Sequence, residues 1–525
     1  MASLAIAQAV HKFVQELIKH PVDEPLDAIL EDAMIAEHEI RLLLGAHREG
    51  VQDLYIGLFD VFKLYPPARR TRRIANQIPS NASKYHILPL TTRFRRPDLA
   101  SSTVPDLGVF LKHWQLFSHG SLKEMQPLDW NNVLAAGGSV TACILAQAPD
   151  ISNRKLNEHF QSDLYSSSYI DLFLWGLSPK EAEKKMIAIY KAVCASAPWK
   201  VTCVRRAKTI TIHTTYPHRP VRISLRLYQS PAEIIAGFDM DSSCFAYDGT
   251  TVYANPRALT AIIRQANTVD ISRHSPSFEY RLAKYALRGF QIYIPSLDRD
   301  RVKPWVYNPN LQHFPNGLAK LLVLEKALTS PDYYYYLDYQ AISPKSDFDS
   351  DMASTEKLYG LDLDAKKVKE KISQEDTTNM YTGLRDQLAV LWPGISELHG
   401  RLAISNPFYD GHRHICFVGS MRKCLRPSCE NQDCDRHQAT EDSVLGKGVS
   451  DQFTTFPSSV PGAESLAYAR FEAWAQEAYE DREEVDNNDY HIHGPVILDD
   501  DESDDSNGSE YADAVSRTSA QLQLD

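Results

Sequence analysis

The chain has 525 residues, which is longer than one compact core usually permits, so two or three structural units are expected. Hydrophobic residues make up 43% and aromatic residues 10%, enough for a large core, and no apolar run is long enough to span a membrane. The formal net charge of −12 is concentrated near the C-terminus, so the overall acidity does not exclude an anionic ligand elsewhere in the chain.

The cysteine content and the N-terminal pattern bear on the compartment of the protein. Eight cysteines in a long chain without a secretory signal favour free thiols or a metal site over a disulfide framework. The first twenty residues place apolar side chains at helical spacing, with polar residues between them, which is typical of a packed amphipathic helix. We therefore expect a protein of the cytoplasm or nucleus that does not enter a membrane.

Residues 1–104 predict a helical region that ends in a basic connector, and residues 105–302 predict a domain of alternating helices and strands. In this domain Ser178-Pro179 and Ser230-Pro231 are typical helix starts, because serine caps a first turn and proline suits its first position. Further helices are expected at Leu111–Phe117, Pro256–Gln265 and Phe278–Leu287. Strands are expected from Asn132 into the turn at Gly137, and at Ser168–Trp175, Val201–Arg205, Thr209–Thr214, Val221–Leu227 and Phe238–Tyr247.

The sequence after this domain is less regular and divides into three segments. Residues 303–400 predict helical and irregular structure with a linker, residues 401–440 are rich in Cys and His, and residues 441–525 predict a helix and a tail. The tail segment Glu480–Asp513 holds 14 acidic residues and one basic residue, so we expect it to be disordered. The expected fold is therefore α/β (α+β), a small mixed sheet flanked by helical segments. The helices expected after residue 303 are Gly317–Ala327, Asp364–Ile372 and Ala463–Tyr479.

Two neighbouring strands of the central domain carry residues suited to phosphate chemistry. The turn Gly137-Gly138-Ser139 closes the first strand, and such a turn lets backbone N–H groups and a hydroxyl approach a phosphate closely. The second strand contains Tyr169 and Asp171, which alternate with apolar residues and therefore share one face. Carboxylates on such a face, with a third from a neighbouring strand, can hold the metal ions that assist in-line attack on a phosphate.

These features resemble the signature of the DNA polymerase beta-type nucleotidyltransferase superfamily, over about residues 130–260. The chain is also similar to a less characterised family of fungi and other microbes, through the blocks 129–133, 222–228 and 237–241. The superfamily resemblance implies that Gly137, Gly138 and Ser139 bind a nucleotide. It implies magnesium ligands at Asp171 and at Asp239 or Asp241, between which the sequence does not choose.

The match to the metal site is incomplete. Tyr169 occupies the position of the first carboxylate, and a phenol cannot replace a bridging carboxylate. Asp163 could substitute only if its loop folds back. The resemblance therefore implies a catalytically impaired protein that binds nucleotide or nucleic acid. An active nucleotidyltransferase that uses Asp171 with Asp239 or Asp241 and magnesium remains the first alternative.

A second alternative is a noncatalytic scaffold that recruits protein partners through its N-terminal helices and acidic tail. Other residues suit either binding or structure. Arg222 and Arg226 lie on one face of a predicted strand and can face phosphates or form ion pairs, and Tyr285 can stack on a base or pack in a core. The Cys/His-rich segment offers four zinc ligands, although it lacks the close pair of cysteines typical of zinc sites; the set is Cys424, Cys429, Cys434 and His437.

Overall fold

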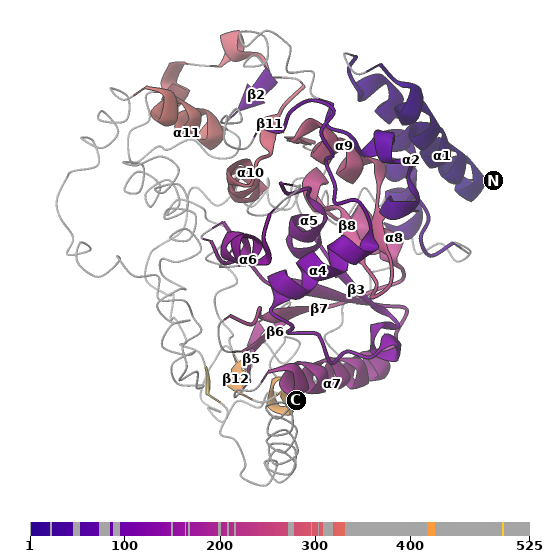
Figure 1. Cartoon of the computed structure of the whole chain (residues 1–525), viewed down its shortest axis with the longest axis vertical. Coiled ribbons are helices and arrows are strands. Elements are labelled where there is room, and N and C mark those ends of the chain that lie inside the picture. The colour runs from indigo at the N-terminus through magenta and orange to yellow at the C-terminus, as the bar shows by residue number, and fades with distance from the viewer. Residues whose placement is uncertain are drawn as a thin grey trace, which may run out of the picture.

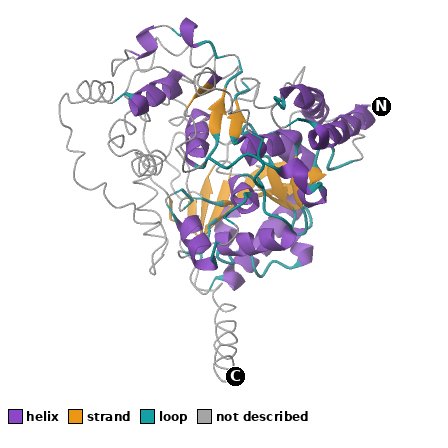
Figure 2. Ribbon diagram, turned by 45° about the horizontal axis from the view of Figure 1, so that its top comes forward, coloured by secondary structure: helices purple, strands orange, loops and turns teal. Residues whose placement is uncertain are grey.

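The computed structural model describes most of residues 2–330 and, beyond them, only residues 417–419, 421–425 and 496–497. Within the first range it does not describe residues 22–23, 46–52, 73–84, 88–94, 149–150, 163, 166–167, 198–200, 207–208, 215–216, 271–277, 296, 303 and 308–318. Helices and mixed sheets together make up the described part, which confirms the predicted α/β fold class (Figures 1 and 2).

A ten-stranded sheet forms the centre of the molecule, with the strand order β1-β9-β8-β3-β4-β7-β6-β5-β12-β13. Strand β3 is antiparallel to β4, whereas β4 and β7 are parallel, because helix α7 and the hairpin of β5 and β6 connect them. The bounds are β1 (Phe59–Asp60), β3 (Val133–Ala136), β4 (Ile170–Trp175), β5 (Thr202–Arg206), β6 (Thr209–His213), β7 (Val221–Tyr228), β8 (Phe245–Tyr247), β9 (Val252–Ala254), β12 (Phe417–Gly419) and β13 (Val496–Ile497). A smaller sheet has the order β10-β11-β2, with bounds β10 (Ala266–Thr268), β11 (Gln291–Tyr293) and β2 (His86–Ile87).

The helices surround the sheet on several sides. Figure 1 shows α4, α5 and α6 in front of the strands, α7 below them, α1 and α2 at the right, and α10 and α11 at the upper left. The bounds are α1 (Ala2–Lys19), α2 (Asp27–Gly45), α4 (Leu107–Ser118), α5 (Gly138–Ile144), α6 (Asn153–Gln161), α7 (Pro179–Ser196), α8 (Pro231–Ala236), α9 (Pro256–Arg264), α10 (Phe278–Leu287), α11 (Ala319–Thr329) and α15 (Met421–Leu425).

The helix starts follow the capping residues that the sequence indicates. Ser178 and Glu181 form a capping box at α7, in which the Ser178 N–H donates to Glu181 Oε2 at 2.9 Å. At α8 the Ser230 hydroxyl oxygen accepts from the Glu233 N–H at 3.2 Å, and proline follows each of these serines. Both predicted helix starts are confirmed.

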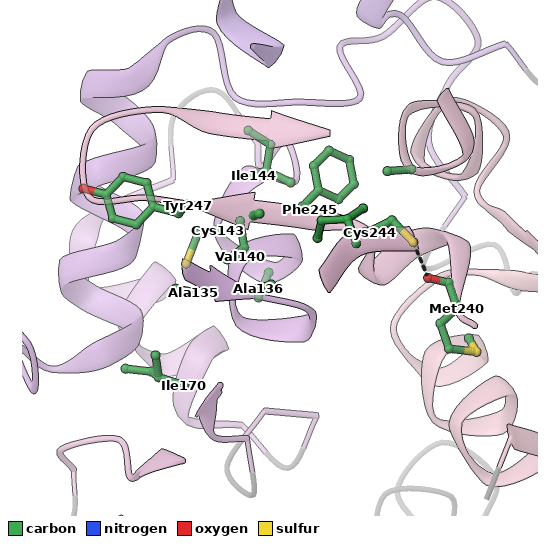
Figure 3. Close-up of a cluster of buried hydrophobic side chains, with 14 of the residues drawn as sticks. Ala135, Ala136, Val140, Cys143, Ile144, Ile170, Met240, Cys244, Phe245 and Tyr247 are labelled. Atoms are coloured by element: carbon green, nitrogen blue, oxygen red, sulfur yellow. Dashed lines mark hydrogen bonds between the residues drawn. The ribbon is translucent and has the colours of Figure 1, made fainter. Parts of the chain in front are cut away.

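The main core lies where β3, β4 and β8 meet α4 and α5. Every residue of β3 is buried, and so are Val140, Cys143 and Ile144 on α5. Figure 3 shows these α5 side chains beside Phe245 and Tyr247 of β8, with Ile170 of β4 below. The close packing fixes the turn between β3 and α5 relative to the two neighbouring strands.

A buried ion-pair network joins the N-terminal helices to the central domain. Arg257 on α9 contacts Glu37 of α2, with 2.7 Å between Nη2 and Oε1, and contacts Asp241, with 2.6 Å between Nη1 and Oδ1. All three side chains are at most 8% exposed. Charges this deeply buried require partners, so the network determines how α2 lies against α9.

Arginines from the predicted basic connector hold neighbouring backbone in place. Arg69 and Arg72 are buried, with Arg69 Nη1 donating to the Val104 carbonyl oxygen at 3.1 Å and Arg72 Nη1 donating to the His20 carbonyl oxygen at 2.7 Å. Arg96 Nη2 donates to the carbonyl oxygen of Ile262 at 2.7 Å. These guanidinium groups satisfy carbonyl oxygens between elements that are far apart in the sequence.

The strand predicted at Phe238–Tyr247 is wrong over most of its length. Residues Asp241–Ser243 form a 3₁₀ turn, and only Phe245–Tyr247 enter the sheet as β8. The Asp241 carboxylate accepts from the Thr268 N–H at 2.9 Å, and the Ser242 N–H donates to Asn267 Oδ1 at 2.8 Å. These contacts with β10 draw the segment away from an extended conformation.

Strands from outside residues 105–302 lengthen the sheet at both edges. β1 pairs with β9, and β12 pairs antiparallel with β5. The fully buried Arg205 of β5 donates from Nη1 to the Cys424 carbonyl oxygen at 2.7 Å, which anchors α15 beside this edge. Two residues of the predicted acidic tail form β13. The helices predicted at Asp364–Ile372 and Ala463–Tyr479, and the rest of the tail, lie outside the described residues.

His119 makes the stability of the fold sensitive to pH. Its ring lies 3.0 Å from Gln161 Nε2, and burial, followed by the charges of Arg219 and His218, lowers its pKa to about 4. Below pH 6.5 the unfolded chain therefore binds a proton at this position that the folded chain does not bind, so stability falls as the pH decreases from 6.5 towards 4.

We expect His119→Asn to reduce the loss of unfolding free energy between pH 7 and pH 5 by about 1–2 kcal/mol, measured by urea denaturation. Asparagine suits the left-handed backbone at this position, where φ is 51°. His11→Asn, at an exposed position of α1, is the control. An equal pH dependence in the two variants would contradict this role for His119.

Among the described residues, the structure contains no helix that is both long enough and apolar enough to cross a membrane.

Candidate functional site

The central strands present one buried face and one partly exposed face. In β4 the buried residues Ile170, Leu172 and Leu174 alternate with partly exposed ones, among them Asp171, and β7 repeats this pattern. Asp171 is directly opposite Arg222 in the parallel pair. Tyr169 and Asp171 therefore point to the same side, as their spacing predicts.

The glycine turn at the end of β3 lets neighbouring side chains lie close to its backbone. Gly137 has a φ of 88°, which strongly favours glycine, and α5 begins at the next residue. A Cβ atom added to Gly138 would lie 2.9 Å from Tyr285 Oη and 3.3 Å from Arg288 Nη1. Ser139 is 2% exposed, and its hydroxyl has no hydrogen-bond partner among the described residues.

Each predicted metal-binding carboxylate has an arginine partner. Asp171 Oδ1 accepts from Arg222 Nε at 2.5 Å, and the same guanidinium group lies 4.9 Å from the centroid of the Tyr169 ring. Asp239, which is 5% exposed, forms a two-bond pair with Arg281 of α10. Arg222 and Arg281 therefore bind the two carboxylates to which the resemblance assigns magnesium.

Asp241 belongs to the buried Arg257 network described above, and its second oxygen accepts from Thr268 N–H. The carboxylate therefore connects α9 and β10. Neither Asp239 nor Asp241 lies on a strand, which corrects the expectation that the third metal ligand comes from one.

Four basic residues gather beside the turn and Asp171. Burial, followed by the charges of Arg288, Arg222 and Arg281, holds the pKa of Lys284 well below its usual value of 10.5. Asp171 opposes this effect. The guanidinium groups of Arg222, Arg281 and Arg288 exceed the carboxylates Asp171 and Asp239 by one charge, and a bound anion would favour the protonated form of Lys284. The cluster therefore repels further cations and favours an anion.

Arg288 is fixed on the inner side of this cluster. Its Nε and Nη2 donate to the Leu164 carbonyl oxygen at 3.0 and 2.8 Å, and Nη2 also donates to Ser168 Oγ at 2.8 Å. The remaining nitrogen, Nη1, lies beside Gly138. Tyr285 is buried against this arginine, so the core-packing alternative for Tyr285 is confirmed, and burial raises its pKa to about 12.

The donor set does not fit a magnesium site with several carboxylates. Each of the three aspartates is engaged by a guanidinium group, and the described residues contain no group of three or more His, Cys, Asp or Glu placed to hold a metal. A cation that used the carboxylate oxygens now paired with arginine would have to displace those guanidinium groups. Asp163, which the sequence offers as a substitute for the first metal-binding carboxylate, lies outside the described residues.

The zinc prediction concerns a segment of which little is described. Cys424 is buried on α15, and its thiol donates to the Cys203 carbonyl oxygen at 3.7 Å. Cys429, Cys434 and His437 lie outside the described residues, so the four-ligand zinc set remains a prediction.

Sequence reasoning gave no role to Arg288 or to the Glu37–Arg257 pair. The sequence does indicate part of the cationic cluster. Arg281, Lys284 and Arg288 are spaced by three and four residues, a spacing that places side chains on one face of a helix. The Glu37–Arg257 pair joins residues 220 positions apart, and no local pattern indicates such a contact.

Comparisons with known proteins show that this chain is similar to a virus-encoded protein and to an anti-defence family. The family described as "Gabija anti-defense 2 family protein" matches residues 109–265. "Uncharacterized protein R883" of Acanthamoeba polyphaga mimivirus is 29% identical over 232 residues, which cover 41% of this chain and 48% of that protein. The chain thus spans about half the length of the curated relative that it matches. No solved structure matches the chain.

Proposed function

We propose that this chain is a nucleotidyltransferase-like protein, catalytically impaired, that binds the phosphate groups of a nucleotide or nucleic acid without magnesium. The observation that carries the proposal is the gathering of Arg222, Arg281, Lys284 and Arg288 around Asp171 beside Gly138. A phosphate oxygen placed there would relieve the repulsion among the cations and could accept a hydrogen bond from the Ser139 hydroxyl.

The impairment follows from the same contacts. Tyr169 takes the place of one expected carboxylate, and Arg222 and Arg281 neutralise two others at 2.5 and 2.7 Å. A nucleotidyl transfer assisted by two metals needs carboxylates that are available to both ions. The arrangement instead favours holding a phosphate in place.

Calorimetry with ATP tests the proposal on the full chain. We expect binding in EDTA that magnesium does not strengthen, and a roughly tenfold weaker affinity in Lys284→Met, because a charge-assisted contact to phosphate is lost. The matched control is Lys191→Met, at an exposed position of α7. Gly138→Ala should also weaken binding, since its Cβ would meet Tyr285 Oη at 2.9 Å.

Two outcomes would overturn this function. ATP binding that requires magnesium would favour the active nucleotidyltransferase, and equal affinities in Lys284→Met and Lys191→Met would place the phosphate elsewhere. Thermal unfolding of each variant separates a lost site from a lost fold.

The match to residues 109–265 supports a second proposal, on biological role. We propose that the chain acts against a defence system, with binding of a nucleotide or nucleic acid as its means. Protection of a virus in cells that carry the system named by the matched family, compared between the wild type and Lys284→Met, tests this role. Equal protection by both would separate the role from the phosphate site.

A further inference from the structure

The partly exposed face of β4 and β7 combines aromatic and basic side chains. We call it the aromatic–arginine face and define it by six residues, all partly exposed; they are Tyr169, Phe173, Trp175, Arg222, Arg226 and Tyr228. The apolar residues that alternate with them are buried on the opposite side of the same strands. The rings of Phe173, Trp175 and Tyr228 also pack against the edge of the core, and each residue keeps part of its surface exposed.

The rings make contacts with other rings at two places along the strands. The Phe173 centroid lies 5.8 Å from that of Tyr228 and 5.5 Å from that of Phe238, beside the glycine turn. At the far end of β4, the Trp175 centroid is 6.3 Å from that of Tyr55. Rings therefore lie both near the glycine turn of the proposed phosphate site and at the far end of β4.

Positive charge accompanies the rings. Arg226 lies 4.5 Å from the Tyr228 centroid and pairs with Glu233, and Arg222 lies 4.9 Å from the Tyr169 centroid. The side chains of Arg222 and Arg281 remain 39% and 32% exposed. The surplus of positive charge therefore lies at the end of the face near Asp171. A ligand that lies along the face can reach it.

We propose that the aromatic–arginine face binds single-stranded nucleic acid, whose backbone enters at the cationic cluster and whose bases stack on the rings of β4 and β7. The proposal rests on the proposed phosphate site and names the ligand class that this site serves. Alternate residues of a strand lie about 6.6 Å apart, so the rings along β4 can contact successive bases of an extended strand.

The chemistry of the face favours this ligand over two others. Bases in a duplex are stacked on each other and cannot lie flat on rings of a sheet, so a duplex would use only the charges. An acidic peptide would pair with the arginines and leave the rings of Phe173 and Trp175 without planar partners. A single strand uses both sets of side chains.

Fluorescence anisotropy with a labelled thymidine oligonucleotide of about 15 nucleotides tests the proposal on the full chain. We expect Trp175→Leu and Tyr228→Leu each to weaken binding by roughly 10- to 100-fold, because leucine retains bulk but cannot stack. The matched control is Tyr65→Leu, which removes a ring that is 59% exposed and outside the face. Both face variants should bind ATP as the wild type does.

The outcomes separate this inference from the proposed function. Equal oligonucleotide affinity in Trp175→Leu, Tyr228→Leu and Tyr65→Leu, with each variant folded, would overturn the inference while ATP binding still stood. A duplex that binds as tightly as the single strand would also overturn it. Oligonucleotide binding that depends on these rings, without any ATP binding, would instead contradict the nucleotide part of the proposed function.

Discussion

Arg257→Leu is expected to lower the free energy of unfolding by about 3–5 kcal/mol, because it leaves two buried carboxylates without a cation. Arg257 is 2% exposed and holds Glu37 and Asp241, and its Nη2 also donates to the Phe238 carbonyl oxygen at 2.9 Å. Urea denaturation monitored by circular dichroism measures the change. A loss below about 1 kcal/mol would show that the network adds little to stability.

Two further variants identify the cause of that loss. Arg154→Leu breaks an exposed ion pair with Glu158 on α6, so it should change stability by less than about 1 kcal/mol. Adding Glu37→Met and Asp241→Leu to Arg257→Leu removes the unpaired charges and should recover much of the stability. Failure to recover would assign the loss to packing rather than to uncompensated charge.

The buried network also bears on the site. Phe238, whose carbonyl oxygen accepts from Arg257, packs near Gly137, where a Cβ atom would lie 3.5 Å from the Phe238 ring. Asp239 follows directly and pairs with Arg281. The contact between α2 and α9 therefore supports the loop that brings both the ring and the carboxylate to the glycine turn.

Local patterns predicted much of the framework of this site. The alternation of Tyr169 and Asp171 with apolar residues identified the exposed face of β4, and the two glycines identified the turn after β3. Capping residues identified the starts of α7 and α8. Each of these features depends on contacts within a few residues, which is why the sequence alone is sufficient.

The partners of the carboxylates could not be predicted in the same way. Asp171 pairs with a residue 51 positions away, and Asp239 with one 42 positions away. Whether a carboxylate holds a metal or an arginine depends on which elements meet in space. The failed strand prediction at Phe238–Tyr247 has the same cause, since Asp241 and Ser242 bond to β10 rather than to a neighbouring strand.

Asp171→Asn is expected to strengthen ATP binding by roughly 10- to 30-fold in low salt, the opposite of what loss of a metal ligand would do. In the proposed site Asp171 offsets the charge of Arg222, 2.5 Å away, and lowers the positive potential that attracts a phosphate. Removing one negative charge at about 8 Å from a phosphate is worth about 2 kcal/mol at an effective dielectric constant near 20. Calorimetry in EDTA and in magnesium measures the change.

Asp248→Asn is the matched control, because Asp248 caps the turn to Thr250 and Thr251 away from the cationic cluster. Its affinity for ATP should equal that of the wild type. Weaker binding in Asp171→Asn that appears only with magnesium would restore Asp171 as a metal ligand and favour the active enzyme. If Asp171→Asn binds ATP more tightly in EDTA, and added salt reduces this gain, the Asp171 carboxylate weakens an anion site. Salt reduces the gain because it screens the attraction between the cationic cluster and the phosphates.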